Sequence, residues 1–285
     1  MPAVAKVIDE ALSIQPISFI DKGDHMDVVL IGTVALLSSG LTFLSGFGLG
    51  TLLMPVFALF FPVPLAIAAT AVVHFANNIF KFGLMAKQAD WRVVARFSVP
   101  GAVAAMAGAA MLNLFDNLPV ITRYAIGGST FEITAVKAVI GVLIVIFALL
   151  ELSPPVQALE FPPRWLPLGG AVSGFFGGLS GNQGALRSAF LLKAGLSKEA
   201  FVATGVVSAV IVDAARLIVY GTAVITSHFG QSGALVVPVV VGSVCAFIGA
   251  FVGKHLLQKV TLRTVQLIVA TGMLAIGIGL TSGLI

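Results

Sequence analysis

Long apolar stretches alternate with short polar segments along nearly the whole chain. A helix needs about 20 predominantly apolar residues to cross the hydrocarbon core of a bilayer. Eight stretches have spanning or near-spanning length: 28–45, 64–86, 91–114, 135–151, 165–181, 199–226, 233–253 and 262–284. Two shorter stretches, 51–61 and 185–194, suit half-helices or re-entrant segments. The pattern therefore predicts an all-α polytopic membrane protein.

The order of these elements repeats in the second half of the chain. Each half is expected to contain about four long apolar helices plus one short helix that follows a glycine-rich break. Ser45-Gly46 in the first half matches Ser180-Gly181 in the second, as weakly similar internal repeats do. The predicted organisation is a polar N-terminal tail and one transmembrane domain: tail 1–27, domain 28–285, repeat one 28–151, proline-rich link 152–164 and repeat two 165–285.

Basic residues in short loops predict the topology, because such loops stay in the cytoplasm. If each half crossed the membrane four times, the basic loops Lys87–Arg96 and Lys254–Arg263 would fall on opposite sides. Each glycine-rich break separates a long stretch from a short one. If such an interrupted pair contributes an even number of membrane crossings, or none, each half has an odd number of crossings and every basic loop lies on one side. We therefore expect two inverted repeats, with Trp91 and Trp165 at the cytoplasmic interface. The expected location of the protein is a bacterial inner membrane.

Composition narrows the function. The chain is 58% hydrophobic and only 10% charged, with a mean hydropathy of +1.08, whereas soluble domains carry about 25% charged residues. The net charge of +4 is too small to indicate nucleic acid, and the single Cys245 excludes an intrachain disulfide. We find no phosphate-binding loop and no paired His/Cys spacing. The expectation is a protein that is not an enzyme and binds no metal or cofactor; its partners are the lipid bilayer and a small anionic substrate. Homodimer formation stays open.

Two glycine-rich breaks interrupt the apolar pattern at corresponding places. The first break carries glycines, and the second carries amides and a guanidinium: Gly46, Gly48 and Gly50, then Asn182, Gln183 and Arg187. Paired interrupted segments of this kind are the best sequence pointer to a transporter's binding site. The alternative interpretation is close helix packing through small residues. Amides and an arginine at membrane depth favour the binding site.

Polar side chains inside the long stretches extend this site. The first half contributes Thr70, His74, Asn77, Asn78 and Lys81, and the second contributes Thr204, Ser208, Asp213 and Arg216. We assign Asn77, Asn78, Thr70 and Thr204 to substrate binding, and His74, Asp213 and Arg216 to coupling. Thr70, His74, Asn77 and Lys81 form one helical stripe, and Asp213 and Arg216 are spaced to pair. Two alternatives remain open: His74 as a core imidazole, and Asp213 and Arg216 as a pair that only neutralises itself.

Arg187 stands near the start of the second short helix. A helix N-terminus presents unpaired N–H groups and a partial positive charge, so the arginine and the adjacent amides suit an oxyanion. A guanidinium binds sulfonate, sulfite or carboxylate in a forked geometry. A lipid phosphate is the other candidate partner for Arg187.

These motifs resemble those of a known family. Ser45–Pro55, followed by Ala69-Thr70, resembles the first repeat motif of the TauE/SafE sulfite exporter family, and Ser173–Arg187, followed by Ala203-Thr204, resembles the second. The resemblance covers about residues 28–285. It implies export or uptake of sulfite, thiosulfate, sulfoacetate and related organosulfonates or carboxylates, without an ATPase of the chain's own. A proton-coupled secondary transporter working by alternating access is the expected function; an anion channel, a carboxylate transporter and a membrane scaffold are the alternatives.

Overall fold

The computed structural model describes residues 26–42, 49–127, 129–157, 159–224, 233–256 and 262–285. Ten α-helices of eight or more residues occur in these ranges: α2 (Met26–Thr42), α3 (Leu49–Ala58), α4 (Val63–Met85), α5 (Trp91–Asp116), α6 (Ala135–Leu152), α8 (Leu166–Ser180), α9 (Gly184–Leu191), α10 (Lys198–Val219), α13 (Val236–Leu256) and α14 (Leu262–Ser282). Short helical turns connect them: η1 (Ala86–Gln88), α7 (Pro154–Gln157), η2 (Pro163–Trp165), η3 (Tyr220–Val224) and η4 (Gly233–Leu235).

Each predicted apolar stretch overlaps one of these ten helices over most of its length. Five helical segments are long and apolar enough to cross a membrane: Val63–Gln88, Trp91–Asp116, Ala135–Leu152, Lys198–Thr222 and Gly233–Val252. Together with the further apolar helices, they make the chain a multi-pass membrane protein. Helix α8, the first helix of the second half, has 15 residues and is shorter than the predicted stretch 165–181. The predicted tail 1–27 lies outside the described residues except for its last two.

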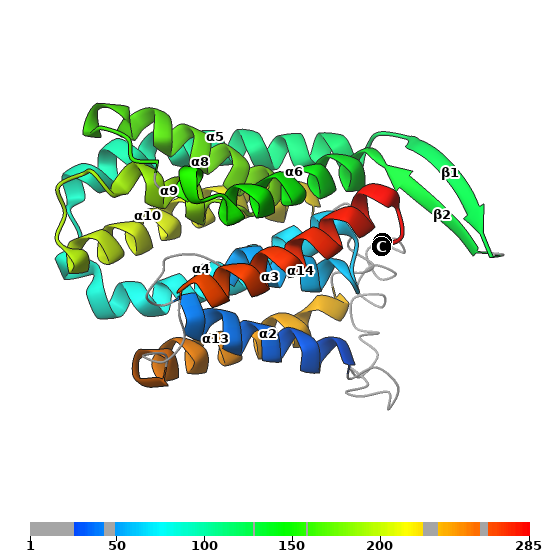
Figure 1. The fold of residues 1–285 in the computed structure, drawn as a ribbon, viewed down its shortest axis with the longest axis horizontal. Helices are drawn as coiled ribbons and strands as arrows, with labels where there is room; N and C mark the ends of the chain where they lie inside the picture. Colours follow the sequence, from blue (N-terminus) through cyan, green and yellow to red (C-terminus); the bar gives the residue numbers. More distant parts are fainter. Residues whose placement is uncertain (1–25, 43–48, 128, 158, 225–232, 257–261) are drawn as a thin grey trace, which may run out of the picture.

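A β-hairpin occupies the loop between α5 and α6, and it is the one departure from the all-α prediction within the described residues. Strands β1 (Val120–Ile126) and β2 (Ser129–Thr134) pair antiparallel around Gly127, whose φ is +60°. The hairpin projects beyond the ends of the helices (Figure 1). It is attached to the C-terminal end of the chain, because the Tyr124 hydroxyl donates to the carbonyl of Ser282.

The second break folds the chain back on itself. Helix α8 ends at Gly181, whose left-handed conformation (φ 81°) is readily adopted by glycine. Beyond it, α9 returns along α8: a Cβ added to Gly169, near the start of α8, would lie 2.2 Å from the ring of Phe190, near the end of α9. Helices α8 and α9 therefore form a helical hairpin instead of one straight broken helix.

Glycines on one face of α8 bring it into backbone contact with α5. A Cβ on each glycine would come within 2.0 Å or less of a carbonyl oxygen of α5: Gly170 meets Phe97, Gly174 meets Gly101, and Gly178 meets Ala105. The residue numbers of the contacting positions rise together along α8 and α5, so the two helices are parallel. A stripe of small residues is what allows helix backbones to approach this closely in membranes. Gly174 and Gly178, which precede the second break, thus serve close helix packing.

The same arrangement recurs at the opposite side of the bundle, where α2 lies along α13 (Figure 1). A Cβ on Gly249 of α13 would lie 2.1 Å from the carbonyl oxygen of Leu36, and Gly32 of α2 faces Val241 and Cys245. This pair is also parallel. Each close pair therefore joins one helix from the first half of the chain with one from the second.

We expect Gly178→Ala to destabilise the protein, because its Cβ has no room beside Ala105. Overpacking a well-packed interface costs about 1–3 kcal/mol, and here the obstacle is backbone that cannot rotate away. Gly83→Ala in α4 is the matched control, because its Cβ would meet nothing within 4 Å, and alanine is the better helix former. Thermal unfolding in detergent should show a lower Tm for Gly178→Ala and an unchanged or higher one for Gly83→Ala. Equal Tm values would contradict the close packing.

The two central pairs run antiparallel. Helices α4 and α10 contact each other where His74 meets Asp213, and Asp90, in the chain after α4, contacts Thr204 of α10. Residue numbers therefore rise along one helix while they fall along the other. Helices α6 and α14 behave likewise, since Gly141 faces Thr281 and Gly277 faces Val145.

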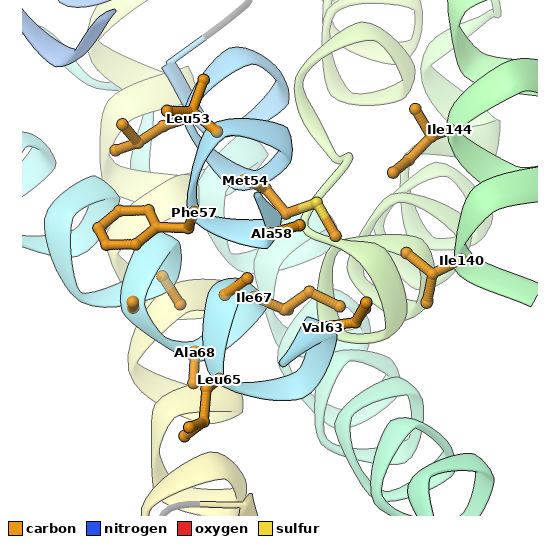
Figure 2. Close-up of a cluster of buried hydrophobic side chains, with 14 of the residues drawn as sticks. Leu53, Met54, Phe57, Ala58, Val63, Leu65, Ile67, Ala68, Ile140 and Ile144 are labelled. Carbon is orange, nitrogen blue, oxygen red and sulfur yellow. The ribbon is translucent and has the colours of Figure 1, made fainter. Parts of the chain in front are cut away.

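The apolar core lies where α3, the first half of α4 and α6 meet. Leu53 and Phe57 of α3, Ile67 of α4 and Ile140 of α6 are completely buried there, and Figure 2 shows their side chains in one cluster. The polar residues of α4 come later in the same helix. The cluster therefore fills one end of the α3–α4 region and leaves the other end for the site.

Candidate functional site

Gly50, the described end of the first break, meets the second break at a cavity of about 60 Å³. Its walls come from the start of α3, the second half of α4, the α8–α9 turn with α9, and the first turns of α10. A Cβ on Gly50 would lie 3.4 Å from the carbonyl oxygen of Gly181 and 3.9 Å from the ring of His74. Gly50 of the first break therefore lies beside Gly181 of the second break. Gly46 and Gly48 lie outside the described residues.

The first described turn of α3 and the N-terminal turn of α9 face this cavity. Leu49, Gly50 and Thr51 line it from α3, and Gln183 and Gly184 line it from α9. The first N–H groups of a helix have no partner within the helix, and they carry the positive end of its dipole. The Thr51 hydroxyl is buried and meets no hydrogen-bond partner among the described residues. These groups are donors suited to a negatively charged guest.

The charged side chains of the lining are basic. Lys81 of α4 and Arg187 of α9 both line the cavity, and each residue is only 7% exposed. Among the described residues that form its wall there is no aspartate or glutamate. Arg187 lies inside the protein, away from the helix surface that a lipid headgroup would reach. The lining is therefore electropositive.

A buried carboxylate lies behind the wall. Asp213 Oδ1 accepts hydrogen bonds from Arg216 Nη2 at 2.7 Å, from Arg216 Nε at 3.0 Å and from Gln183 Nε2 at 3.0 Å. Its other oxygen, Oδ2, lies 2.6 Å from His74 Nδ1. Asp213 and Arg216 are thus paired as their spacing predicted, and both of the carboxylate oxygens are used.

Arg216 also closes the end of α8. Its Nη1 donates to the carbonyl of Gly177 at 2.8 Å, and the Tyr220 hydroxyl donates to the carbonyl of Gly178. The last carbonyls of a helix lack partners within the helix and carry its negative end, so cationic and hydroxyl donors stabilise them. The coupling residues predicted for α10 therefore also position the second break.

His74 connects this network to the cavity, because it lines the cavity and contacts Asp213. Asn78 Nδ2 lies 3.1 Å from His74 Nδ1 and 3.3 Å from Nε2. Asn77 lines the cavity one turn along and accepts a hydrogen bond from Ser39 Oγ at 3.3 Å. Titration of an imidazole in this position would change the charge at the cavity wall.

The structure brings together most of the residues that the sequence singled out. The cavity lining contains Gly50, His74, Asn77, Asn78, Gln183 and Arg187, with Asp213 and Arg216 directly behind. Three others lie outside the lining. Thr204 Oγ1 accepts from the backbone N–H of Asp90 at 3.0 Å, Asn182 lies within 3.5 Å of Ser180, and Thr70 is buried in α4.

Lys81 is the charged residue of the described cavity lining that the site assignment left out. It continues the stripe of His74 and Asn77 by one turn of α4, so the helical spacing could have identified it. Ser188 and Gly205 also line the cavity, and no pattern in the sequence marks them. Gly205 leaves room for Arg187, whose Nε would lie 3.7 Å from an added Cβ.

Comparisons with known proteins bear on this arrangement. Within the part of the chain that the structure describes, no group of three His, Cys, Asp or Glu side chains could hold a metal ion. Neither the comparison with curated proteins nor that with solved structures gives a match. The family model of the sulfite exporter TauE/SafE matches residues 28–280, nearly the whole chain. The multi-pass helical protein with an electropositive cavity between its two breaks belongs to the sulfite exporter TauE/SafE family.

Proposed function

We propose that the protein is a secondary active transporter of a small sulfur oxyanion or organosulfonate, and that the substrate binds in the cavity between the two breaks. One observation carries the proposal: Lys81, Arg187, the first described turn of α3 and the N-terminal turn of α9 line one cavity. The substrate class comes from the family, and the geometry supports an anion as its charge type. The proposed location is the bacterial inner membrane.

The size of the cavity agrees with a small guest. One water requires at least about 10–15 Å³ measured in this way, so about 60 Å³ accommodates a few waters or a compact anion. An anion that leaves water loses its hydration and needs several donors at once. Arg187 offers a fork, Lys81 a point charge, and Thr51, Ser188 and the helix N-termini offer neutral donors.

The helix arrangement supports inverted repeats. A two-fold axis parallel to the membrane makes corresponding helices antiparallel when they pack on each other, as α4 and α10 do, and as α6 and α14 do. The same axis exchanges the pair α5–α8 with the pair α13–α2. Helices α8 and α9, on either side of the second break, form a hairpin, and this supports an even number of membrane crossings for the two together. With an even number, all the basic loops lie on one side of the membrane.

The position of the cavity favours loading from the cytoplasm. Its lining runs from His74 to Met85, where α4 ends, and includes Phe201 and Val202, where α10 begins. The basic residues Lys87 and Lys198 flank this end of the bundle, and basic loops are cytoplasmic. The apolar cluster of Figure 2 fills α3 and α4 on the other side of the cavity. This asymmetry supports an inward-facing state of an alternating-access cycle.

Flux through purified protein in proteoliposomes tests the function. We expect sulfite, thiosulfate or sulfoacetate to accumulate against its own gradient when a proton gradient is imposed, and a matched dicarboxylate to accumulate less. An anion channel would only dissipate gradients, and a scaffold would give no flux. Either of these results, or preferential accumulation of the carboxylate, would contradict the proposed function.

His74 is the proposed coupling residue, because it faces the cavity and contacts Asp213. An unperturbed histidine titrates between about pH 5 and 8. In the proposed cycle, His74 loses its proton as the pH rises, and the cavity wall then loses a positive charge. We expect proton-driven uptake by the parent to fall with rising pH, and His74→Gln to flatten this dependence. The control is binding of the anion at a fixed low pH, which should persist. An unchanged pH profile in His74→Gln would remove His74 as the coupler.

A further inference from the structure

The proline-rich link between the two halves lies against the short helix α9. The ring of Phe161, in the link, stacks on the ring of Phe190 in α9, with ring centres 4.2 Å apart and ring planes 14° from parallel. The backbone N–H of Phe161 donates to the carbonyl of Ala189 at 3.4 Å. Carbonyls in the last turn of a helix lack partners within the helix, and here the link provides one. These two contacts attach α9 to the segment that joins the halves.

The link contacts a side of α9 that does not face the cavity. One face of α9 lines the cavity with residues spaced three or four apart: Gly184, Arg187, Ser188 and Leu191. Ala189 and Phe190, which the link contacts, lie outside the described lining. The link therefore supports, from behind, the helix whose other face presents Arg187 to the cavity.

The link is stiff where it meets α9. Phe161 precedes Pro162 and Pro163, and a residue before proline is restricted to the extended region, while each proline has a fixed φ. Pro162 is extended, with φ −64° and ψ 153°, and it leads directly into the turn η2 and then α8. Gly169 of α8 makes room for Phe190, because an added Cβ would lie 2.2 Å from its ring. The ring of Phe190 is thus in contact with both α8 and the stiff end of the link.

Helix α9 depends on such contacts for its orientation. It has only eight residues, and helices shorter than about 12–15 residues are marginal without tertiary packing. Phe190 belongs to a small apolar cluster, separate from the main core, against which Phe161 packs; its other buried members are Val93, Phe97, Leu166 and Leu191. Because Arg187 and Phe190 are three residues apart on one helix, a rotation of α9 would move both side chains together.

We infer that Phe161 is a positioning residue for the anion site, and that it holds α9 in the orientation in which Arg187 faces the cavity. The inference rests on the proposed function and adds to it a residue outside the cavity lining. Phe161 acts through Phe190 and the helix that carries Arg187. When α9 leaves this orientation, the apparent affinity falls with the fraction of molecules that keep it.

Removal of the Phe161 ring tests this role. Binding of sulfite and of thiosulfate to the full-length protein in detergent is measured by calorimetry. We expect Phe161→Ala to weaken both by about twofold to tenfold, the range that corresponds to loss of a stacked aromatic pair. Phe161→Tyr keeps the ring and should bind as the parent does. Phe161→Leu keeps apolar bulk without the ring, and its affinities should lie between those of Phe161→Ala and the parent.

Two further measurements separate positioning from a general loss of stability. Hydrogen exchange of the backbone amides of α9 should become faster in Phe161→Ala, return to the parent rate in Phe161→Tyr, and stay unchanged in α14. In the Arg187→Ala background, Phe161→Ala should cause little additional loss of affinity, because no guanidinium remains to be oriented.

Other contacts of the same kinds provide the controls. Phe131 stacks on Tyr124 in the β-hairpin, with ring centres 5.5 Å apart and planes 27° from parallel, and neither lines the cavity. Phe131→Ala should therefore leave both affinities unchanged. Glu160→Gln removes the ion pair in which Lys193 Nζ lies 2.9 Å from Glu160 Oε2, with side chains 56% and 39% exposed. Exposed pairs stabilise little, so this variant should change the affinities less than Phe161→Ala does.

The outcomes distinguish this inference from the proposed function. Unchanged affinities, or unchanged exchange of α9, in Phe161→Ala would overturn the positioning role. Equal losses of affinity in Phe131→Ala, or losses that add to those of Arg187→Ala, would overturn it as well. Failure of the parent to bind either anion would overturn the proposed function, and the exchange of α9 would still decide whether Phe161 holds this helix. Phe161→Leu permits the same tests if Phe161→Ala does not insert.

Discussion

Replacing Arg187 by alanine is expected to abolish most anion binding while leaving the protein inserted and folded. Arg187 lines the cavity from the first turn of α9, and it is 7% exposed. Loss of a hydrogen bond to a charged group costs about 1.5–3 kcal/mol, which weakens affinity about tenfold or more. Arg187→Lys should recover only part of the affinity, because an ammonium does not reproduce the fork of a guanidinium.

Calorimetry with sulfite, sulfoacetate and thiosulfate on purified protein measures this effect. Arg92→Ala is the matched control, because Arg92 is an exposed arginine at the start of α5 and lies outside the cavity. Its affinities should equal those of the parent. If Arg187→Ala binds the best of these anions as tightly as the parent does, Arg187 has a structural role and the binding site lies elsewhere.

Breaking the pair of Asp213 and Arg216 is expected to give the largest loss of stability. Both residues are buried, with exposures of 0% and 1%, and removal of one partner leaves an uncompensated charge inside the protein. Such losses amount to about 3–5 kcal/mol. Asp213→Asn and Arg216→Gln should each lower the Tm sharply in detergent. The double variant should lose less than the sum of the two, because neither charge is then left alone.

An exposed ion pair provides the comparison. Arg123 Nε lies 2.6 Å from Glu132 Oε1 on the β-hairpin, with side chains 64% and 43% exposed. Exposed pairs contribute about 0–1 kcal/mol, so Glu132→Gln should change the Tm little. If the stability losses of Asp213→Asn and Arg216→Gln add up in the double variant, the two charges are stabilised independently. That result would contradict the hydrogen bonds between Asp213 and Arg216.

Hydropathy predicts the helices of this protein well, because in a membrane each apolar stretch must satisfy its own backbone hydrogen bonds as a helix. The short stretches 51–61 and 185–194 accordingly became α3 and α9. The paired breaks also predicted where polar groups would converge, and Gly50, Gln183 and Arg187 do meet there. Inverted repeats remain a proposal, supported by the antiparallel central pairs.

Other features depend on contacts that no local pattern encodes. The β-branched residues of Val120–Ile126 and the following Gly127-Gly128 are a hairpin signal, but a search for apolar stretches treats this segment as a loop. Thr70 and Thr204 match between the repeats, yet Thr204 accepts the N–H of Asp90 instead of facing the cavity. Sequence position places them on the right helices. Which face a helix turns toward the cavity depends on how its neighbours pack.

The glycine-lined contacts of α5 with α8 and of α2 with α13 have a consequence for how the chain is divided. Each contact joins the two halves, so neither half encloses its own close-packed face. A polypeptide severed within 154–163 would yield two fragments that are each incomplete, and each would recover its partner helix only by associating with the other. The units that move during transport are accordingly expected to contain helices from both halves, and the proline-rich link between the halves does not mark a boundary between moving bodies.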